Sequence, residues 1–404
     1  MDPVINTSIK KRRVFYIPGY DPYPPRRYRE LYRTQGEDQA GISGYDIAVR
    51  QRARQPGYGW FVDAVIDDIP VHSEIDVLLW SDLVRTSMDK GILATYLIMF
   101  RTAWIYLSTG ALRRMTWLRK GPILAALYPV GMLIIQALIA IGVAWAVGAL
   151  VSALTFANAG WIVAIPIAVV IFRKFAAMDR RVMAYYLMQD YGYAARFHGR
   201  NPPELDARLG EFEQKIDAAL GSDVDEVLVV GHSSGAHLAI HVLSDLIRQG
   251  KTTGKHPKLA LLTLGQVVPM VSFLPKAAKL RADLNFLSQS DEMTWVDVSA
   301  PGDGCSFALC DPVAVSGVAP PNKRWPLVFS AAFSQTLSKE RFQKLKRRFF
   351  RLHFQYLCAF DRPGDYDYFQ ITAGPVALSD RYAHRNPSKS RIDVAASKYK
   401  SMKF

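Results

Sequence analysis

The longest stretch of the chain without an ionisable side chain limits its fold more than any other feature. From residue 121 to residue 172 the sequence has no Asp, Glu, Lys, Arg or His, a run of 52 residues. A single helix that crosses a membrane needs only about 20 apolar residues. Because lipid offers no hydrogen-bond partners to peptide groups, such a run is expected to be helical apart from a turn at the far surface. The sequence therefore predicts a membrane-spanning hairpin of two helices.

The small and polar residues near the end of this run mark its turn, Ala157-Asn158-Ala159-Gly160. We expect the first helix from Tyr128 to Phe156 and the second from Gly160 to Lys174, with a kink at Pro166. The alternative is a buried helical pair in a soluble core. A core of that size rarely lacks every ionisable group, which favours the membrane.

Basic residues flank both ends of the predicted hairpin. Because arginine and lysine accumulate on the cytoplasmic side, both ends should face the cytoplasm, and the rest of the chain with them, at an inner membrane. The N-terminal sequence MDPVINTSIKKRR has no apolar segment, so no signal peptide is expected. The flanking residues are Arg113, Arg114, Arg119 and Lys120 before the run, and Arg173, Lys174, Arg180 and Arg181 after it.

The basic character of the chain points to lipid. The formal charge is +14 and the pI is near 9.6, and the basic residues gather beside the apolar run without the basic and aromatic pattern of RNA-binding modules. We therefore expect an anionic bilayer as partner and no nucleic acid. The segment from Ile92 to Trp117 is apolar and aromatic but contains Arg101, which is typical of an interfacial helix. Three cysteines without disulfide or zinc spacing are expected to be reduced thiols.

A short sequence motif predicts a nucleophilic serine. The β-branched run Val227–Val230 is typical of a buried parallel strand, and it leads into Gly231-His232-Ser233-Ser234-Gly235 and then a helical stretch from Ala236 to Arg248. In a GxSxG turn of this kind the serine occupies a strained position, and Gly231 and Gly235 let strand and helix pass closely. Ser233 is the predicted nucleophile.

With this motif in place, the chain resembles the α/β-hydrolase superfamily. The resemblance implies a mostly parallel α/β sheet with helices on both faces, interrupted here by the two-helix membrane insertion. It also implies an oxyanion-hole loop after an earlier strand, which matches Arg13–Ile17 followed by Pro18-Gly19-Tyr20. Since Pro18 departs from the usual His, only the backbone role is carried over. The N–H groups of Tyr20 and Ser234 would form the oxyanion hole.

The superfamily order of serine, acid and histidine directs the search for the other two residues of a triad. The strand Thr294–Val298 is followed by a loop that contains Asp303, where the resemblance implies the acid. Asp297, within the strand, and Asp311 are the alternatives. The acid would hold the histidine in one tautomer and stabilise its charged form.

Two histidines lie late enough in the chain to act as the base. His353 lies in an aromatic setting and is preferred, and His384, between arginines near a polar tail, is the alternative base. His232 is expected to pack beside the nucleophile. His237 and His241 are four residues apart but lack a third ligand, so no metal is expected.

The order of these features divides the chain into four segments. Residues 1–90 supply the oxyanion strand and loop, 91–182 the interfacial helix and hairpin, 183–385 the catalytic part, and 386–404 a basic tail expected to be disordered or to lie on anionic lipid.

Together these features predict a membrane-anchored serine hydrolase, esterase-like or lipase-like, that cleaves an ester or thioester through an acyl-enzyme. The anchor favours a lipid or another lipophilic acyl substrate, and no cofactor is expected. The alternatives are an acyltransferase and a catalytically silent scaffold with the same fold.

Overall fold

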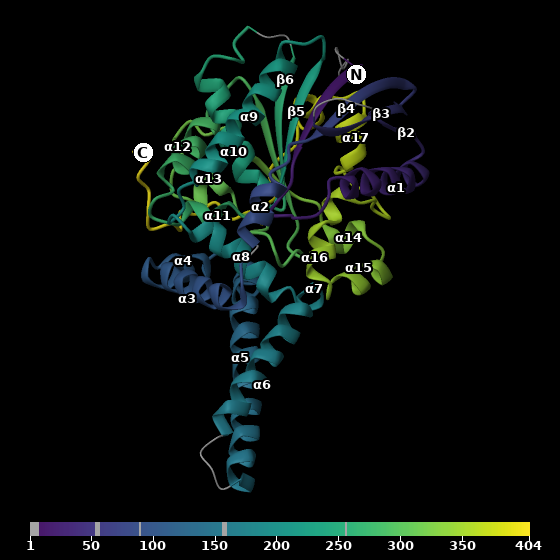
Figure 1. Cartoon of the computed structure of the whole chain (residues 1–404). Helices are drawn as coiled ribbons and strands as arrows, with labels where there is room; N and C mark the ends of the chain where they lie inside the picture. Colours follow the sequence, from purple (N-terminus) through teal and green to yellow (C-terminus); the bar gives the residue numbers. More distant parts are fainter. Residues whose placement is uncertain (1–7, 53–56, 89, 156–159, 255–256) are drawn as a thin grey trace.

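The computed structural model describes residues 8–404 except 53–56, 89, 156–159 and 255–256. Within these residues the strands form one sheet of eight, in the order β2-β3-β4-β1-β5-β6-β7-β8 (Figure 1). The strands are β1 (Lys11–Ile17), β2 (Asp46–Gln51), β3 (Tyr58–Ile66), β4 (Ile69–Val77), β5 (Glu226–His232), β6 (Lys258–Leu264), β7 (Thr294–Ser299) and β8 (Leu327–Ser330).

The helices divide into those around the sheet and those of the insertion. The insertion and its surroundings contain α2 (Ser81–Met88), α3 (Ile92–Ser108), α4 (Ala111–Met115), α5 (Lys120–Thr155), α6 (Gly160–Ala177), α7 (Asp179–Val182) and α8 (Ala184–Ala195). The others are α1 (Arg26–Ser43), α9 (Pro203–Leu220), α10 (Gly235–Arg248), α11 (Val268–Ser272), α12 (Ala278–Leu287), α13 (Pro312–Val315), α14 (Phe333–Thr336), α15 (Lys339–Leu345), α16 (Phe349–His353), α17 (Tyr368–Ala373) and α18 (Leu378–Arg381).

Most of the sheet is parallel, as predicted. β4, β1, β5, β6, β7 and β8 pair in parallel, whereas β2 and β3 add an antiparallel edge. β1 and β5 are neighbours although the insertion separates them in sequence. The carboxyl ends of the parallel strands therefore meet at one edge of the sheet, which is where open α/β sheets build their sites.

Apolar side chains alternate between the two faces of the sheet. Val14 and Tyr16 of β1 join one cluster of buried residues, and Phe15 and Ile17 join the other. Helices α9, α10 and α12 cover the second face, and α1, α14 and α17 cover the first (Figure 1). The central strand β5 is buried along its whole length, which accounts for its unbroken apolar run.

The apolar run forms the two helices α5 and α6, which project from the domain as a stalk (Figure 1). Both are long and apolar enough to cross a membrane. Their exposed surface would be unfavourable in water, since Leu138, Trp145 and Leu154 are 66%, 73% and 70% exposed. The expected turn falls largely on residues 156–159, which lie outside the described part of the chain.

The first helix of the hairpin begins earlier than Tyr128, at Lys120. A helix of 36 residues is about 54 Å long, well over the roughly 30 Å of a bilayer core. The surplus packs within the protein, where Leu133 is buried with Met99, Ala184 and Met188. The base of α5 thus belongs to the domain and its distal part to the hairpin.

Helix α3 lies across the base of the stalk (Figure 1). With 17 residues it is about 25 Å long, too short to span a bilayer core alone. Its exposed large side chains recur at helical spacing along one face, which is the pattern of a helix lying in a membrane surface. They are Leu93, Leu97, Phe100, Trp104 and Leu107.

The last residues of the chain differ from the expected disorder. Ile392 forms a bridge to Cys310, and its N–H donates to the Leu309 carbonyl at 2.7 Å. Ala396 is buried, and its N–H donates to the carbonyl of Val315 at 3.0 Å. Composition suggested disorder because these residues are polar, but paired backbone groups and a few small buried side chains hold the segment against the domain.

Candidate active site

Ser233 lies in a sharp turn between the central strand and the helix behind it. β5 ends at His232, α10 begins at Gly235, and Ser233 has a positive φ of 56°. Such a conformation is unfavourable for a residue with a Cβ and is found where the surrounding structure imposes it. Ser233 is partly exposed, whereas its neighbours in the turn are buried. The predicted order of strand, turn and helix is present.

The two glycines of the motif permit the close packing of this turn. A Cβ on Gly235 would lie 2.1 Å from the Ile17 carbonyl oxygen, and one on Gly231 would lie 2.7 Å from the Cα of Ala236. Neither position tolerates a side chain. The spacing of the motif thus follows from contacts with β1 and with the first turn of α10.

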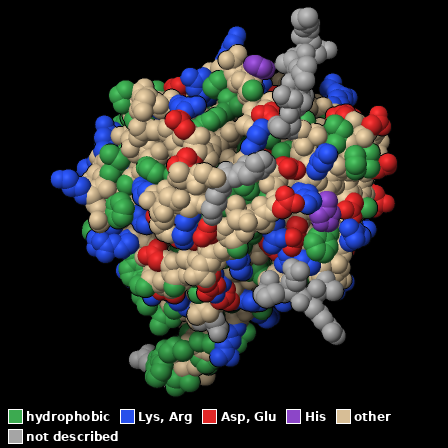
Figure 2. Space-filling view, turned by 90° about the horizontal axis from the view of Figure 1, so that it is seen from above, with side chains coloured by type: hydrophobic (Ala, Val, Ile, Leu, Met, Phe, Trp, Pro, Cys, Tyr) green, Lys and Arg blue, Asp and Glu red, His purple; other side chains and the backbone are tan. Residues whose placement is uncertain are grey.

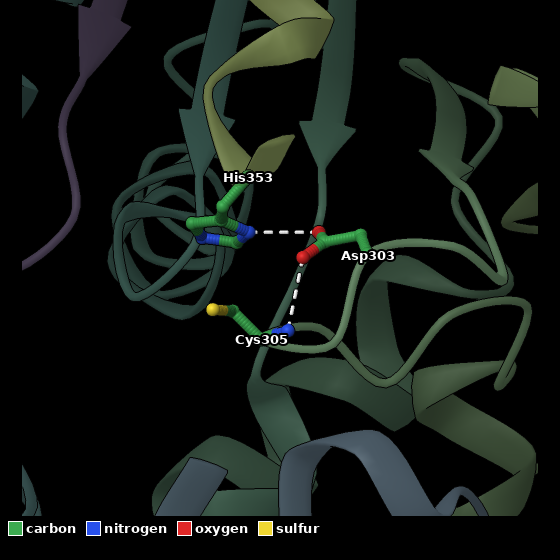
Figure 3. A group of neighbouring side chains, drawn as sticks. All are labelled: Asp303, Cys305 and His353. Carbon is green, nitrogen blue, oxygen red and sulfur yellow. Dashed lines mark hydrogen bonds and ion pairs between the residues drawn. The ribbon is translucent and has the colours of Figure 1, made fainter. Parts of the chain in front are cut away.

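Asp303 and His353 are brought together from the loop after β7 and the end of α16. Nδ1 of His353 donates to Oδ2 of Asp303 at 2.7 Å (Figure 3). The Asp303 side chain also accepts from the hydroxyl of Tyr356 at 3.0 Å and from the N–H of Cys305 at 2.9 Å. The carboxylate is therefore fixed in position and leaves Nε2 as the free nitrogen of the ring.

The Asp303 carboxyl is charged despite its burial. Burial by itself would raise its pKa, but the charge and hydrogen bond of His353 and the N–H donor of Cys305 outweigh this, so the pKa of Asp303 lies below its ordinary value. An ionised acid next to Nδ1 stabilises a protonated imidazole. This is the electrostatic role of the acid in a triad.

The alternative acids lie in other environments. Asp297, inside β7, accepts from the Thr263 hydroxyl at 2.6 Å, and burial raises its pKa to about 8. Asp311 caps α13 through the N–H groups of Val313 and Ala314. Of the three candidates, Asp303 alone forms a hydrogen bond with a candidate base among the described residues.

The candidate bases also differ. His353 is 5% exposed, and its Nε2 is buried without a hydrogen-bond partner among the described residues. His384 follows α18, is exposed, and does not line the cavity that contains Ser233. A neutral imidazole with a free Nε2 is able to accept a proton from a serine hydroxyl.

One cavity is bordered by both Ser233 and His353. It has a volume of about 480 Å³, within the usual range for ligand pockets, and its lining includes Ser233, His353 and Tyr20. His232 packs against His353. Its Nε2 donates to the His353 carbonyl at 3.0 Å, and its ring centre lies 4.7 Å from that of His353. Burial lowers the pKa of His232 to about 3, so it is neutral. It is a positioning residue.

The predicted oxyanion loop passes directly beside Ser233. A Cβ on Gly19 would lie 3.0 Å from the Cβ of Ser233, so a larger residue at this position would press against the turn that carries Ser233. The Pro18 carbonyl accepts from the Trp80 indole at 2.9 Å, and the Tyr20 carbonyl accepts from the Tyr186 hydroxyl. Within the described residues, no hydrogen bond is assigned to the N–H groups of Tyr20 and Ser234. Both remain available to a ligand.

Two residues of the cavity were missed by the sequence interpretation. Asp190 lies on α8, and burial raises the pKa of its carboxyl to about 7, an effect that nearby His353 opposes. Cys305 follows the acid in the same loop. Asp190 carries no local motif, and only the packing of α8 against α3, α5 and α11 brings it here.

The one cluster of metal-ligand types found among the described residues is Asp303, Cys305 and His353, with ligand atoms within 4.8 Å of one another (Figure 3). Asp303 and His353 already bind each other, and burial next to Asp303 raises the pKa of the Cys305 thiol well above its ordinary value. A protonated thiol is a poor ligand. The chemistry of the group therefore suits an acid–base pair better than a metal. His241, considered above with His237, binds Asp283 through Nδ1 at 2.6 Å.

Comparison with family models, with curated proteins and with solved structures found no match for this chain.

Proposed function

We propose that this chain is a membrane-anchored serine hydrolase of the α/β-hydrolase type, which cleaves an ester or thioester through an acyl-enzyme. The observation that carries the proposal is the coincidence of three features in one cavity. Ser233 has a positive φ at the end of the central strand, and the His353–Asp303 pair is buried. Among the residues that the structure describes, Nε2 of His353 and two N–H groups beside the serine have no hydrogen-bond partner.

The proposed reaction begins with proton transfer from the Ser233 hydroxyl to Nε2 of His353 as Oγ bonds to the acyl carbon. The N–H groups of Tyr20 and Ser234 would stabilise the negative oxygen of the tetrahedral intermediate. Collapse breaks the bond to the leaving alcohol or thiol, which takes the proton from Nε2. Water then attacks the acyl-enzyme, gives its proton to Nε2, and the carboxylic acid leaves as Ser233 recovers its proton.

The position of the cavity supports a lipophilic substrate. Its lining includes Pro122 at the base of α5 and Arg180 in α7, just after α6, so both feet of the hairpin border it. The exposed apolar face of α3 lies at the same end of the domain (Figure 1). If the hairpin crosses an inner membrane with the domain on the cytoplasmic side, the cavity opens beside the lipid headgroups.

Covalent labelling of the full chain in detergent with a fluorophosphonate probe tests the proposal. Wild type should be labelled on the peptide that contains Ser233, and Ser233→Ala should not be labelled. Loss of labelling in the variant, followed by turnover of p-nitrophenyl butyrate by wild type, would support a hydrolase. A folded wild-type protein that is not labelled would support a silent scaffold.

Hydrolysis and acyl transfer are separated by adding an alcohol acceptor. A hydrolase forms the carboxylic acid as its main product in the presence of glycerol, whereas an acyltransferase forms the glycerol ester. Mass analysis of the products decides between them.

A further inference from the structure

Three arginines border the cavity, and the described structure assigns none of them a carboxylate partner. Arg27 lies near the start of α1, Arg180 in α7 and Arg351 in α16. All three side chains are exposed. Arginines elsewhere on the domain are commonly paired. Arg208 lies 2.7 Å from Asp82, and Arg341 lies 3.0 Å from Asp361.

The guanidinium of Arg27 is held in place by aromatic rings instead of by an acid. It lies 4.6 Å from the ring centre of Tyr23 and 5.1 Å from that of Phe354, the residue next to His353. Stacking of this kind leaves the N–H edge of the guanidinium free for an anion. Arg351 precedes His353 by two residues on the same short helix. Arg27 thus contacts the residue next to His353, and Arg351 lies two residues before it.

Among the described residues, the acids of the cavity form no ion pair with these arginines. Asp21 is buried, accepting from the Tyr28 hydroxyl at 2.6 Å and from the Tyr23 N–H at 2.8 Å. Burial raises the pKa of Asp190 to about 7, so near neutral pH it is only partly ionised. The exposed rim is therefore positive, while the deeper wall near Met183, Leu187 and Met270 is apolar.

The opposite end of the molecule has a different surface. Figure 2 shows that the face seen from above Figure 1 carries Lys and Arg interspersed with Asp and Glu. Mixed charge of this kind favours solubility and selects no ligand. A set of unpaired arginines beside a catalytic cavity and the feet of the hairpin indicates recognition of a specific anion.

We infer that the cavity takes the acyl ester of an anionic phospholipid, with Arg27, Arg180 and Arg351 binding the headgroup phosphate while the acyl carbonyl reaches Ser233. This inference rests on the proposed function. Guanidinium groups bind phosphate oxygens through paired, charge-assisted hydrogen bonds, and the apolar wall would take the acyl chain. A phosphate group is also present in soluble acyl thioesters, but the place of the rim at the feet of the hairpin favours the lipid.

The test uses the full chain in neutral-detergent micelles that contain either dioleoyl phosphatidylglycerol or dioleoyl phosphatidylcholine. We expect kcat/KM for the phosphatidylglycerol ester to exceed that for the phosphatidylcholine ester by about tenfold at low salt, because the anionic headgroup has no amine to offset its charge. The preference should shrink at high salt. Equal rates on the two lipids would overturn the inference.

Substitution separates headgroup recognition from general attraction to anionic micelles. The combined Arg27→Gln, Arg180→Gln and Arg351→Gln variant should lose the preference, and the corresponding triple lysine variant should keep part of it. The matched control is Arg113→Gln, since Arg113 is exposed near the hairpin but does not line the cavity. A control that loses the preference as fully as the triple variant would contradict the inference.

Two further experiments identify the molecule that carries the phosphate, and they distinguish a failure of the headgroup inference from a failure of the proposed hydrolase function. If palmitoyl coenzyme A is turned over in a way that depends on the three arginines, and phosphatidylglycerol is not, then the substrate is a soluble thioester and not a phospholipid. In Ser233→Ala, fluorescent short-chain phosphatidylglycerol should bind more tightly than the phosphatidylcholine analogue, and glycerol 3-phosphate alone should compete weakly. Selective binding without turnover by wild type would contradict the proposed hydrolase and support the headgroup site. Turnover without selective binding would support the hydrolase and contradict the headgroup site.

Discussion

Nδ1 of His353 lies 2.7 Å from Oδ2 of Asp303, and both side chains are almost fully buried. The two residues are 50 positions apart in sequence, and the contact joins the loop after β7 to α16, the third helix after the last strand. Because Tyr356 and the Cys305 N–H hold the carboxylate as well, the orientation of the imidazole is imposed by the fold before any substrate binds.

Asp303→Asn should abolish most turnover while preserving the fold. An amide retains the size of the side chain but cannot stabilise a charged imidazole or impose the correct tautomer, so kcat should fall by about a thousandfold or more with little change in KM. The assay is hydrolysis of p-nitrophenyl butyrate in detergent. Asp297→Asn is the matched control, because Asp297 is equally buried but contacts Thr263. Comparable losses in the two variants would remove Asp303 from its proposed role.

His353→Ala and His384→Ala should differ sharply in fluorophosphonate labelling. Without the imidazole the Ser233 hydroxyl has no base, and labelling should slow by about a thousandfold. His384 is exposed and outside the cavity, so its loss should leave the rate within about twofold of wild type. A slow His384→Ala variant alongside a fast His353→Ala variant would reverse the assignment of the base.

Local signals were sufficient for the strand and turn around Ser233. The β-branched run, the glycines and the following helix all lie within one short segment. The run is explained by the burial of β5, and the two glycines by contacts that a Cβ would prevent. The pairing of Asp303 with His353 was anticipated from the chain order of the superfamily, since no local pattern links the two residues.

The features that the sequence did not predict depend on tertiary packing. Asp190 reaches the cavity because α8 packs against α3, α5 and α11. The early start of α5 is explained by the burial of Ile123 in its first turn, in one cluster with Phe273 and Phe307. The segment after Asn386 has a polar composition, and its order arises from backbone pairing with residues such as Leu309 and Val315. Periodicity and composition carry no information about such contacts.

Asp190→Asn should stabilise the protein at alkaline pH only. The pKa of the Asp190 carboxyl is about 7 in the folded protein, above the value of about 3.9 expected in the unfolded chain. As pH rises between these values, the unfolded state releases its proton first, so the folded state loses stability, and the loss is complete above pH 7. Removing the carboxyl should restore about 2 kcal/mol at pH 8, allowing for its partial exposure.

Thermal unfolding of wild type and Asp190→Asn in detergent between pH 4 and pH 8 measures this effect. The difference in Tm should be near zero at pH 4 and grow toward pH 8. If Asp190→Asn raises Tm by the same amount at pH 4 and at pH 8, the stabilisation arises from packing and not from removal of an ionised carboxyl.

Gly121→Val, in the first turn of α5, should lower kcat although the residue lies in the hairpin and not in the loop that carries Asp303. A Cβ on Gly121 would lie 3.0 Å from the Cα of Gly304, the residue after the acid. A larger side chain would displace the loop that carries Asp303, and kcat should fall by roughly ten- to a hundredfold, since small errors in catalytic geometry are costly. Gly131→Val is the control, because a Cβ on Gly131 meets nothing within 4 Å. An unaffected Gly121→Val variant would show that the loop does not depend on the anchor.

The depths of two tryptophans should distinguish a hairpin with an interfacial helix from three spanning helices. Trp104 and Trp145 are 72% and 73% exposed on α3 and on the distal half of α5. If α3 lies in the membrane surface, lipids brominated near the headgroup should quench Trp104 most strongly. Lipids brominated deep in the acyl chains should quench Trp145 most strongly, since it lies about 15 Å from the end of α5. Each signal is isolated as the difference between wild type and the corresponding Trp→Phe variant in vesicles. Deep quenching of both residues would mean that α3 enters the bilayer core, and the cavity beside it would then open below the headgroups, where a phosphate could not reach the arginine rim.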